Sequence, residues 1–235
     1  MALALAVGCP PRGFHHAAAV YAYFRWADDA VDAPDRDPAE VRRFMQHQAA
    51  LIRGSVPPDH PAERALRWAL ATPELGPRLQ PPVERMAEAL IYDAQRDATP
   101  IPTADLQRQV ENIGDAFVGA IWVCSGAPGT PSDAALLLAR AATATHMLRD
   151  RVEDQALGYS NLPREHFGAT APTDGPTLQA WLAERSAQVD GWFAKGLDDV
   201  ADIQPAGTRR LVRMLGERYR KVLQGLPDGP GVQPS

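Results

Sequence analysis

The sequence of 235 residues predicts an all-α fold, a bundle of helices. Apolar residues recur every three or four positions along most of the chain, whereas the alternation typical of β-strands is absent. Prolines and glycines interrupt this pattern where helices are expected to begin and end. Two Ala-rich segments also carry polar side chains at the helical period. Such stripes are expected in a bundle that holds a charged ligand in its core.

The first two expected helices are bounded by prolines and by an N-cap. The first follows a pair of prolines and runs to about Ala33, because another proline comes next. The second begins at Pro38, since Asp37 is an N-cap residue and Glu40 stands at the capping-box position. It is expected to end at Gly54.

The next three expected helices lie between further proline and glycine breaks. They cover about 61–71, about 81–98, where two prolines open the helix, and about 103–124. The last of them contains Gly114 and Gly119, each costing about 1 kcal/mol relative to alanine in a helix interior. Close approach of a substrate or of a neighbouring helix would explain both glycines.

The C-terminal half is expected to contain three longer helices. Ser132 can cap the first of these, which carries the second acidic cluster and runs toward Gly158. The stretch 169–176 is rich in Thr, Pro and Gly and is predicted to be a loop, a candidate for a mobile cover. The other two helices are expected at about 177–201 and 206–224.

The length fits one large domain, expected over 1–226, and the Gly- and Pro-rich tail 227–235 is expected to be disordered. The apolar segment 1–7 lacks a basic flank and is broken too early for a secretory signal, so a buried helix end is expected there. No stretch approaches the ~20 apolar residues that span a bilayer. We therefore expect a soluble protein with at most a peripheral membrane contact.

Composition excludes several classes of protein. The net charge is −5 and the basic residues are dispersed, which argues against a nucleic-acid partner. The two cysteines, Cys9 and Cys124, lie far apart and show no metal-binding spacing, so a reduced compartment, the cytoplasm, is expected. The sequence does not determine the oligomeric state.

Two acidic clusters about 120 residues apart are the main indication of function. Asp28 with Asp32, and Asp150 with Asp154, are pairs at i and i+4, which share one face of a helix. Like charges so placed repel unless a cation lies between them. Oxygen-only pairs without a nearby cysteine suit a hard cation such as Mg²⁺. One such pair is common on a solvated surface, but two pairs on apolar-rich helices favour a site.

Each pair belongs to a longer polar stripe. Tyr21 and Arg25 precede the first pair on the same helix face, at seven and three residues before its first aspartate. Thr143 and His146 precede the second pair at seven and four residues. An equally good interpretation of Tyr21 is a ring in the core whose hydroxyl has a hydrogen-bond partner.

These segments carry a family resemblance. Residues 21–32, YAYFRWADDAVD, resemble the first aspartate-rich motif of the squalene/phytoene synthase family. Residues 146–155, HMLRDRVEDQ, followed by Leu-Pro at 162–163, resemble the second. Weaker matches are Val-Gly at 118–119 and YRKVL at 219–223. The matches occur in family order along most of the chain.

The resemblance implies a class I isoprenoid synthase-like helical bundle with a central cavity. In that family the two motifs face each other, bind Mg²⁺ and hold the diphosphate of an allylic prenyl substrate such as farnesyl or geranylgeranyl diphosphate. The implied reaction is ionisation of this substrate, followed by carbon–carbon coupling of the cation to a second prenyl diphosphate. The expected enzyme is a prenyl-diphosphate-dependent transferase.

The resemblance also implies roles for individual residues. The expected metal ligands are Asp28, Asp32, Asp150 and Asp154. The expected diphosphate-binding residues are Arg25, Arg149, Thr143, Asn112 and Tyr219, and the expected catalytic residues are Tyr21, Arg25 and His146. Arginine offers parallel donors to phosphate oxygens. An exposed Arg149 paired with Glu153 at i+4 is the alternative interpretation of that arginine.

The chain departs from the family pattern at several positions. The family usually has Gln and Asn where Thr143 and His146 stand, and a tyrosine where Asn112 stands. Its Gly-Arg-x-Tyr-Leu-Pro stretch loses the arginine to Tyr159 and the tyrosine to Asn161. The residues for ionisation are thus retained better than those for coupling.

Two alternatives therefore stay open. In one, the cation closes on itself, as in a terpene synthase or cyclase, or is captured by water or another non-prenyl acceptor. In the other, the chain is a non-catalytic family member, although four mutually repelling carboxylates argue against a dead site. Asp93 falls near an acidic position of the family, but a solvated helix end is the favoured interpretation, and we leave it out of the expected ligands.

Overall fold

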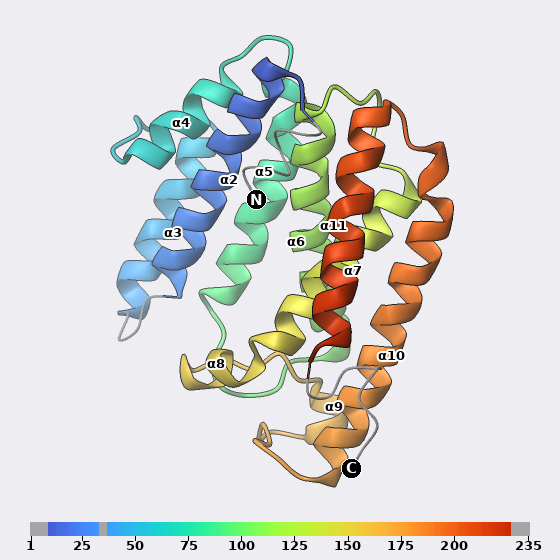
Figure 1. The fold of residues 1–235 in the computed structure, drawn as a ribbon. Helices are drawn as coiled ribbons and strands as arrows, with labels where there is room; N and C mark the ends of the chain where they lie inside the picture. The colour runs from blue at the N-terminus through green and yellow to red at the C-terminus, as the bar shows by residue number, and fades with distance from the viewer. Residues whose placement is uncertain (1–8, 33–36, 227–235) are drawn as a thin grey trace. The chain divides into compact units, whose positions relative to one another are not determined.

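The computed structural model describes residues 9–32 and 37–226, and these residues confirm the predicted all-α fold (Figure 1). The helices are α2 (Pro11–Val31), α3 (Pro38–Ile52), α4 (Pro61–Leu70), α5 (Gly76–Asp93), α6 (Thr103–Cys124), α7 (Asp133–Arg149), α8 (Arg151–Ala156), α9 (Arg164–Phe167), α10 (Pro176–Asp198), the 3₁₀ helix η1 (Asp199–Asp202) and α11 (Ala206–Gln224). Within the described ranges, β-structure is limited to one isolated bridge, between Ile101 and Pro163. None of the described helices is both long and apolar enough to cross a bilayer.

The chain divides into two compact units. Unit 1 contains the residues up to Gln95 together with 115–131 and 204–211, and unit 2 contains 96–114, 132–203 and the residues from 212 onward. The first aspartate pair belongs to unit 1 and the second to unit 2. The single domain over 1–226 remains a prediction, and the predicted tail at 227–235 and helix end at 1–7 lie outside the described residues.

In unit 1, α2 packs against α4 and α5, and α3 packs against the same two helices. A buried polar chain fixes α2 in this layer. The Tyr23 hydroxyl donates to Gln48 Oε1 at 3.1 Å, and Gln48 Nε2 donates to Glu63 Oε1 at 2.7 Å. Burial alone would raise the pKa of Glu63, but the hydrogen bonds it accepts from Gln48 and two backbone amides hold that pKa below its usual value. The helix that carries the first aspartate pair is thereby anchored.

In unit 2, α7 packs along α10. In the same unit, the backbone at Ile101 is hydrogen-bonded to the segment 162–164. Ile101 N donates to Leu162 O at 3.0 Å, and Arg164 N donates to Ile101 O at 2.7 Å. The Arg164 side chain adds a hydrogen bond from Nε to Pro100 O at 3.0 Å. The loop before α6 is thus held against the segment that follows the second aspartate pair.

Most predicted helices are confirmed, and α6 and α11 have the predicted bounds. The helix predicted from residue 81 is wrong at both ends, because α5 begins at Gly76 and ends at Asp93, with Pro81 and Pro82 inside it. Prolines are costly there because they lack an N–H. The helix instead begins with Gly76 and the proline that follows it, ahead of the predicted start at residue 81.

The long helix predicted toward Gly158 is divided into α7 and α8 at Asp150, whose φ and ψ are −89° and 0°. The hydrogen bonds from Asp150 N to His146 O, 2.9 Å, and from Asp154 N to Asp150 O, 2.8 Å, still span the break. The two aspartates therefore stay one turn apart. The short helix α9 was not predicted.

Neighbouring helices explain the two glycines of α6. A Cβ at Gly114 would lie 2.9 Å from the backbone nitrogen of Arg140 on α7. A Cβ at Gly119 would lie 3.1 Å from the side chain of Pro82 on α5. Of the two explanations that the sequence left open, close helix packing is the one that the structure supports.

Candidate active site

The first aspartate pair lies at the C-terminal end of α2. Arg25 Nη1 lies 3.2 Å from Asp28 Oδ2, and its Nη2 lies 2.7 Å from Asp29 Oδ1. Asp32 is the C-cap of the helix, where its backbone N–H donates to Asp28 O at 2.9 Å. Arg25 is exposed, with 62% of its side-chain surface accessible, so its guanidinium can meet an anion from solution.

The carboxylate of Asp28 has a strongly raised pKa. Burial, the nearby Asp32 and then Asp93 raise its pKa to about 7, against the lowering effect of Arg25. The side chain still keeps 44% of its surface exposed, so the carboxylate is crowded yet open to solution. Negative charge from α2 and α5 therefore collects at one place, which favours a bound cation.

Tyr21 lies one turn before Arg25 and contacts an apolar pocket. Its ring meets the ring of Phe117 edge to face, with centroids 6.4 Å apart. The pocket is lined by Ala17, Val20, Tyr21, Phe24, Phe117, Ala120 and Ile121. Tyr21 is half-buried there, so the ring packs in an apolar wall on the face of α2 that also carries the aspartates.

The second pair begins with Asp150, which is held by its neighbour. Arg149 Nε lies 2.6 Å from Asp150 Oδ1 and Nη2 lies 2.7 Å from Oδ2, a bidentate pair. These hydrogen bonds raise the pKa of Arg149, so its guanidinium is a permanent donor. The alternative pairing of Arg149 with Glu153 is not the one that the structure forms.

The contact of Arg149 with His146 assigns the histidine tautomer. Arg149 Nη2 lies 2.9 Å from His146 Nδ1, and because the guanidinium has no acceptor, Nδ1 must accept. The tautomer with its proton on Nε2 satisfies this contact, and Nδ1 also lies 3.7 Å from Asp150 Oδ2. Its ring lies 4.9 Å from the Tyr219 ring, so the Nε2–H and the phenol belong to the same surface of unit 2.

Thr143 and Asn112 are the two other residues of unit 2 that the sequence assigns to diphosphate binding. The Thr143 hydroxyl is buried and donates to Ala139 O of its own helix at 3.1 Å. Asn112 lies half-buried on α6. The structure therefore brings together His146, Arg149, Asp150 and Tyr219, while the roles predicted for these residues, and for Thr143 and Asn112, remain predictions.

Asp154 is the most enclosed of the four aspartates, with 8% of its surface exposed. The Tyr159 hydroxyl donates to Oδ1 at 3.2 Å, and Asn161 Nδ2 donates to Oδ2 at 2.7 Å. A carboxylate has about four lone-pair positions, so these two hydrogen bonds alone do not use up its capacity to accept. Tyr159 and Asn161 are the two positions at which the chain departs from the family's Gly-Arg-x-Tyr-Leu-Pro stretch.

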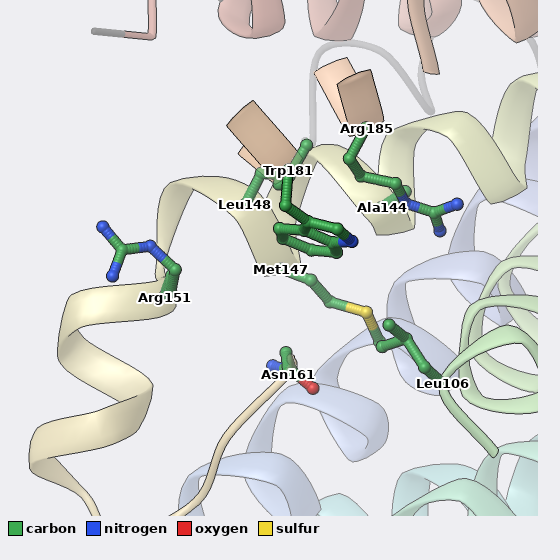
Figure 2. A pocket seen from close by; sticks show the side chains of 8 residues that line it. All are labelled: Leu106, Ala144, Met147, Leu148, Arg151, Asn161, Trp181 and Arg185. Atoms are coloured by element: carbon green, nitrogen blue, oxygen red, sulfur yellow. The ribbon is translucent and has the colours of Figure 1, made fainter. Parts of the chain in front are cut away.

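A second pocket lies in unit 2 beside this network (Figure 2). Its lining is mostly apolar, with Asn161 at one side, and consists of Leu106, Ala144, Met147, Leu148, Arg151, Asn161, Trp181 and Arg185. Figure 2 shows the guanidinium groups of Arg151 and Arg185 on opposite sides of Trp181. They do not converge on one point, so this pocket is not an anion site built from two arginines.

Comparison with known proteins decides the family. The profile of the squalene/phytoene synthase family matches residues 4–231. The chain belongs to this family. A presqualene diphosphate synthase from Rhodopseudomonas palustris is 27% identical over 221 residues, covering 87% of this chain and 75% of the relative. The squalene synthase HpnC from Alicyclobacillus acidocaldarius has the same fold, with a TM-score of 0.69 at 23% identity over 93% of this chain and 84% of its own.

These matches confirm three predictions made from the sequence: the family, the all-α isoprenoid synthase-like fold and the enzyme class, a squalene/phytoene synthase-like transferase.

The kind and number of side-chain donors show whether the residues suit a metal ion. Within the part of the chain that the structure describes, no three His, Cys, Asp or Glu side chains form a complete metal site. Mg²⁺ typically takes one or two carboxylates and completes its shell with water and phosphate oxygens, so aspartate pairs fit it.

The sequence did not identify every residue of the two clusters. The sequence favours a solvated helix end for Asp93, but its surroundings differ from those of Asp97, four residues later. Asp97 accepts hydrogen bonds from Thr99 beyond the helix, whereas Asp93 ends α5 and raises the pKa of Asp28. The sequence gives no indication of a role for Arg96, because its hydrogen bonds to Ser160 and Asn161 join residues more than 60 positions apart.

Proposed function

We propose that this protein ionises an allylic prenyl diphosphate with Mg²⁺ and couples the cation to a second prenyl diphosphate. Membership of the squalene/phytoene synthase family supports the reaction class. The observation that carries the proposal is the placing of Asp28 beside Asp32 and Asp93, whose charges add to the effect of burial in raising the pKa of Asp28 to about 7. Carboxylates that repel one another in a folded site are stabilised when a divalent cation binds between them.

Two aspartate pairs would hold the metal, Asp28 with Asp32 and Asp150 with Asp154. When bound, Mg²⁺ neutralises the leaving diphosphate. Arg25 and Arg149 would pair with diphosphate oxygens, the first from an exposed position and the second while it holds Asp150. His146 Nε2–H would donate to the same group, because Nδ1 is occupied by Arg149.

The apolar side chains around Tyr21 and Phe117 would form part of the wall along a prenyl chain and help to keep water from the cation. In the coupling step one C–O bond breaks, one C–C bond forms, and one diphosphate and one proton leave. This step needs no reductant. One relative, 27% identical, is a presqualene diphosphate synthase. This likeness favours, for the present chain, a coupled product that retains the second diphosphate.

The test is incubation of the protein with Mg²⁺ and single prenyl diphosphates of ten, fifteen or twenty carbons. Pyrophosphate release and extractable products are measured together. A dimeric product with one pyrophosphate per two substrates supports the proposal. A monomer-sized alcohol or cyclic hydrocarbon supports the cyclase or other-acceptor alternative, and no release of pyrophosphate supports the non-catalytic one. A cytoplasmic location and the absence of a nucleic-acid partner remain predictions from the composition.

A further inference from the structure

A closed ring of contacts surrounds Asp154, and Arg96 completes it. Arg96 lies in the loop between α5 and α6, where its Nη2 donates to Ser160 O at 2.5 Å and to Asn161 Oδ1 at 2.9 Å. Its Cζ lies 5.0 Å from the centroid of the Tyr159 ring. Tyr159 and Asn161 are the residues that donate to Asp154. We infer that Arg96 is a positioning residue that holds Asp154 in its metal-binding orientation through these two side chains.

The hydrogen bonds allow one orientation of the Asn161 amide. A guanidinium only donates, so the amide oxygen must face Arg96, and an ionised carboxylate only accepts, so the amide nitrogen must face Asp154. Both conditions are met at once, at 2.9 Å and 2.7 Å. Without Arg96 the amide oxygen loses its donor in a buried place, so only the hydrogen bond to Asp154 itself is left to orient the amide.

Tyr159 is held by a different part of the same arginine. The guanidinium lies over the ring face, where a cation is attracted by the ring's electrons. This contact fixes the plane of the ring, and the hydroxyl reaches Asp154 Oδ1 from that plane. One arginine thus restrains the donors to both carboxylate oxygens.

Burial makes the network sensitive to a missing member. Tyr159, Ser160 and Asn161 keep 9%, 0% and 7% of their surfaces exposed, so water does not readily replace a lost partner. A group that loses its partner in such a buried place is left unsatisfied, which is costly. The chain lacks the family's arginine at position 159, and Arg96 places a guanidinium over the tyrosine found there.

The inference deepens the proposed function and rests on it, because Asp154 is a proposed metal ligand. The test is the Mn²⁺ affinity of the full chain without substrate, measured by electron paramagnetic resonance of the free ion. Arg96→Met keeps the length of the side chain but removes its donors and charge. We expect it to weaken Mn²⁺ binding about 10- to 100-fold, as is typical when a residue that orients a metal ligand is lost.

The sign of this effect separates positioning from simple electrostatics. Removal of a positive charge near a cation site should by itself tighten Mn²⁺ binding. Weaker binding therefore shows that orientation dominates. Arg96→Lys, which keeps a donor and the charge, should recover part of the affinity. In Asn161→Ala, the further change Arg96→Met should cost less than it does in the wild type, because only the contact through Tyr159 is then left to lose.

Arg164→Met is the matched control. Arg164 holds the same two backbone segments through Pro100 O but touches none of the partners of Asp154. It should leave the Mn²⁺ affinity unchanged, with thermal unfolding measured for each variant. Wild-type affinity in Arg96→Met, or an equal loss in Arg164→Met, overturns the inference. Failure of the wild type to release pyrophosphate contradicts the proposed function instead, while the Mn²⁺ measurement still decides the role of Arg96.

Discussion

The two aspartate pairs have the same spacing, but the protein holds them in opposite ways. At the first pair, burial and then the charges of Asp32 and Asp93 raise the pKa of Asp28 to about 7. At the second pair, Asp150 is bound by Arg149 and Asp154 accepts hydrogen bonds from Tyr159 and Asn161.

The comparison shows that one motif can be prepared for a cation in two ways. Repulsion between carboxylates makes a bound cation favourable, and at the first pair the exposed Arg25 is seen to oppose this repulsion. Donors placed on a carboxylate fix its orientation in advance and reduce what a cation must organise. We therefore expect the first pair to respond mainly to changes of charge and the second mainly to changes of geometry.

The largest expected effect comes from removing one aspartate of either pair. Asp28→Ala and Asp150→Ala should each lower the rate of pyrophosphate release by about 1000-fold or more, since several kcal/mol of metal stabilisation is lost. Release is measured with a fifteen-carbon prenyl diphosphate and excess Mg²⁺. The exposed carboxylates Glu40 and Asp133 provide the controls Glu40→Ala and Asp133→Ala. Unchanged turnover in Asp28→Ala or Asp150→Ala would remove these residues from the site.

The next effect concerns geometry at the second pair. Asn161→Ala removes the 2.7 Å hydrogen bond to Asp154, and Tyr159→Phe removes the 3.2 Å one. We expect the Mg²⁺ concentration for half-maximal activity to rise about 10- to 100-fold in Asn161→Ala. The rise in Tyr159→Phe should be smaller, because its hydrogen bond is longer. The reverse order would show that the amide does not set the orientation of Asp154.

A smaller effect is expected from charge at the first pair. Asp93→Ala removes a negative charge that raises the pKa of Asp28. The half-saturating Mg²⁺ concentration should rise several-fold, with little change in the rate at saturating Mg²⁺. Glu88, an exposed carboxylate on the same helix, supplies the control Glu88→Ala. Equal shifts in the two variants would mean that general surface charge, rather than the cluster, is responsible.

The smallest effect is a pH dependence of the metal-free protein. The folded chain keeps the Asp28 proton up to about pH 7, whereas the unfolded chain releases it near the usual value of 3.8. The unfolded state therefore binds fewer protons between these values, and the contribution of Asp28 to stability falls as pH rises. Partial exposure of the side chain keeps this effect modest.

The measurement compares thermal unfolding of the wild type and of Asp28→Asn at pH 5 and pH 7.5 without metal. Other titrating groups cancel in the difference between the two proteins. The melting temperature of Asp28→Asn relative to the wild type should rise with pH, and Mg²⁺ should reduce that advantage. A difference that is the same at both pH values would contradict the raised pKa of Asp28.

The sequence predicted those features that depend on neighbours along the chain. Helix ends at Asp37 and Ser132 were found because an N-cap acts on amides two or three residues away. The aspartate pairs were found because the period of a helix places i and i+4 together. The break between α7 and α8 at Asp150 was not predicted, since no glycine or proline stands there to mark it.

Features that depend on tertiary contacts were not predictable in the same way. Asp93 matters because α5 ends where its charge reaches Asp28. The partner of Asn161 is Arg96, 65 residues earlier in the chain. A departure from the family pattern at 159 and 161 was visible, but the residue that compensates for it was not. Only the fold brings the two segments together.

The central claim, that both aspartate pairs hold Mg²⁺ against a diphosphate, is tested most directly by a crystal structure with Mg²⁺ and inorganic pyrophosphate. The account predicts metal ions within bonding distance of Asp28 and Asp154, with pyrophosphate oxygens completing their shells and Arg25 and Arg149 on the anion. Ions bound elsewhere, or a pyrophosphate in contact with neither aspartate pair, would contradict it.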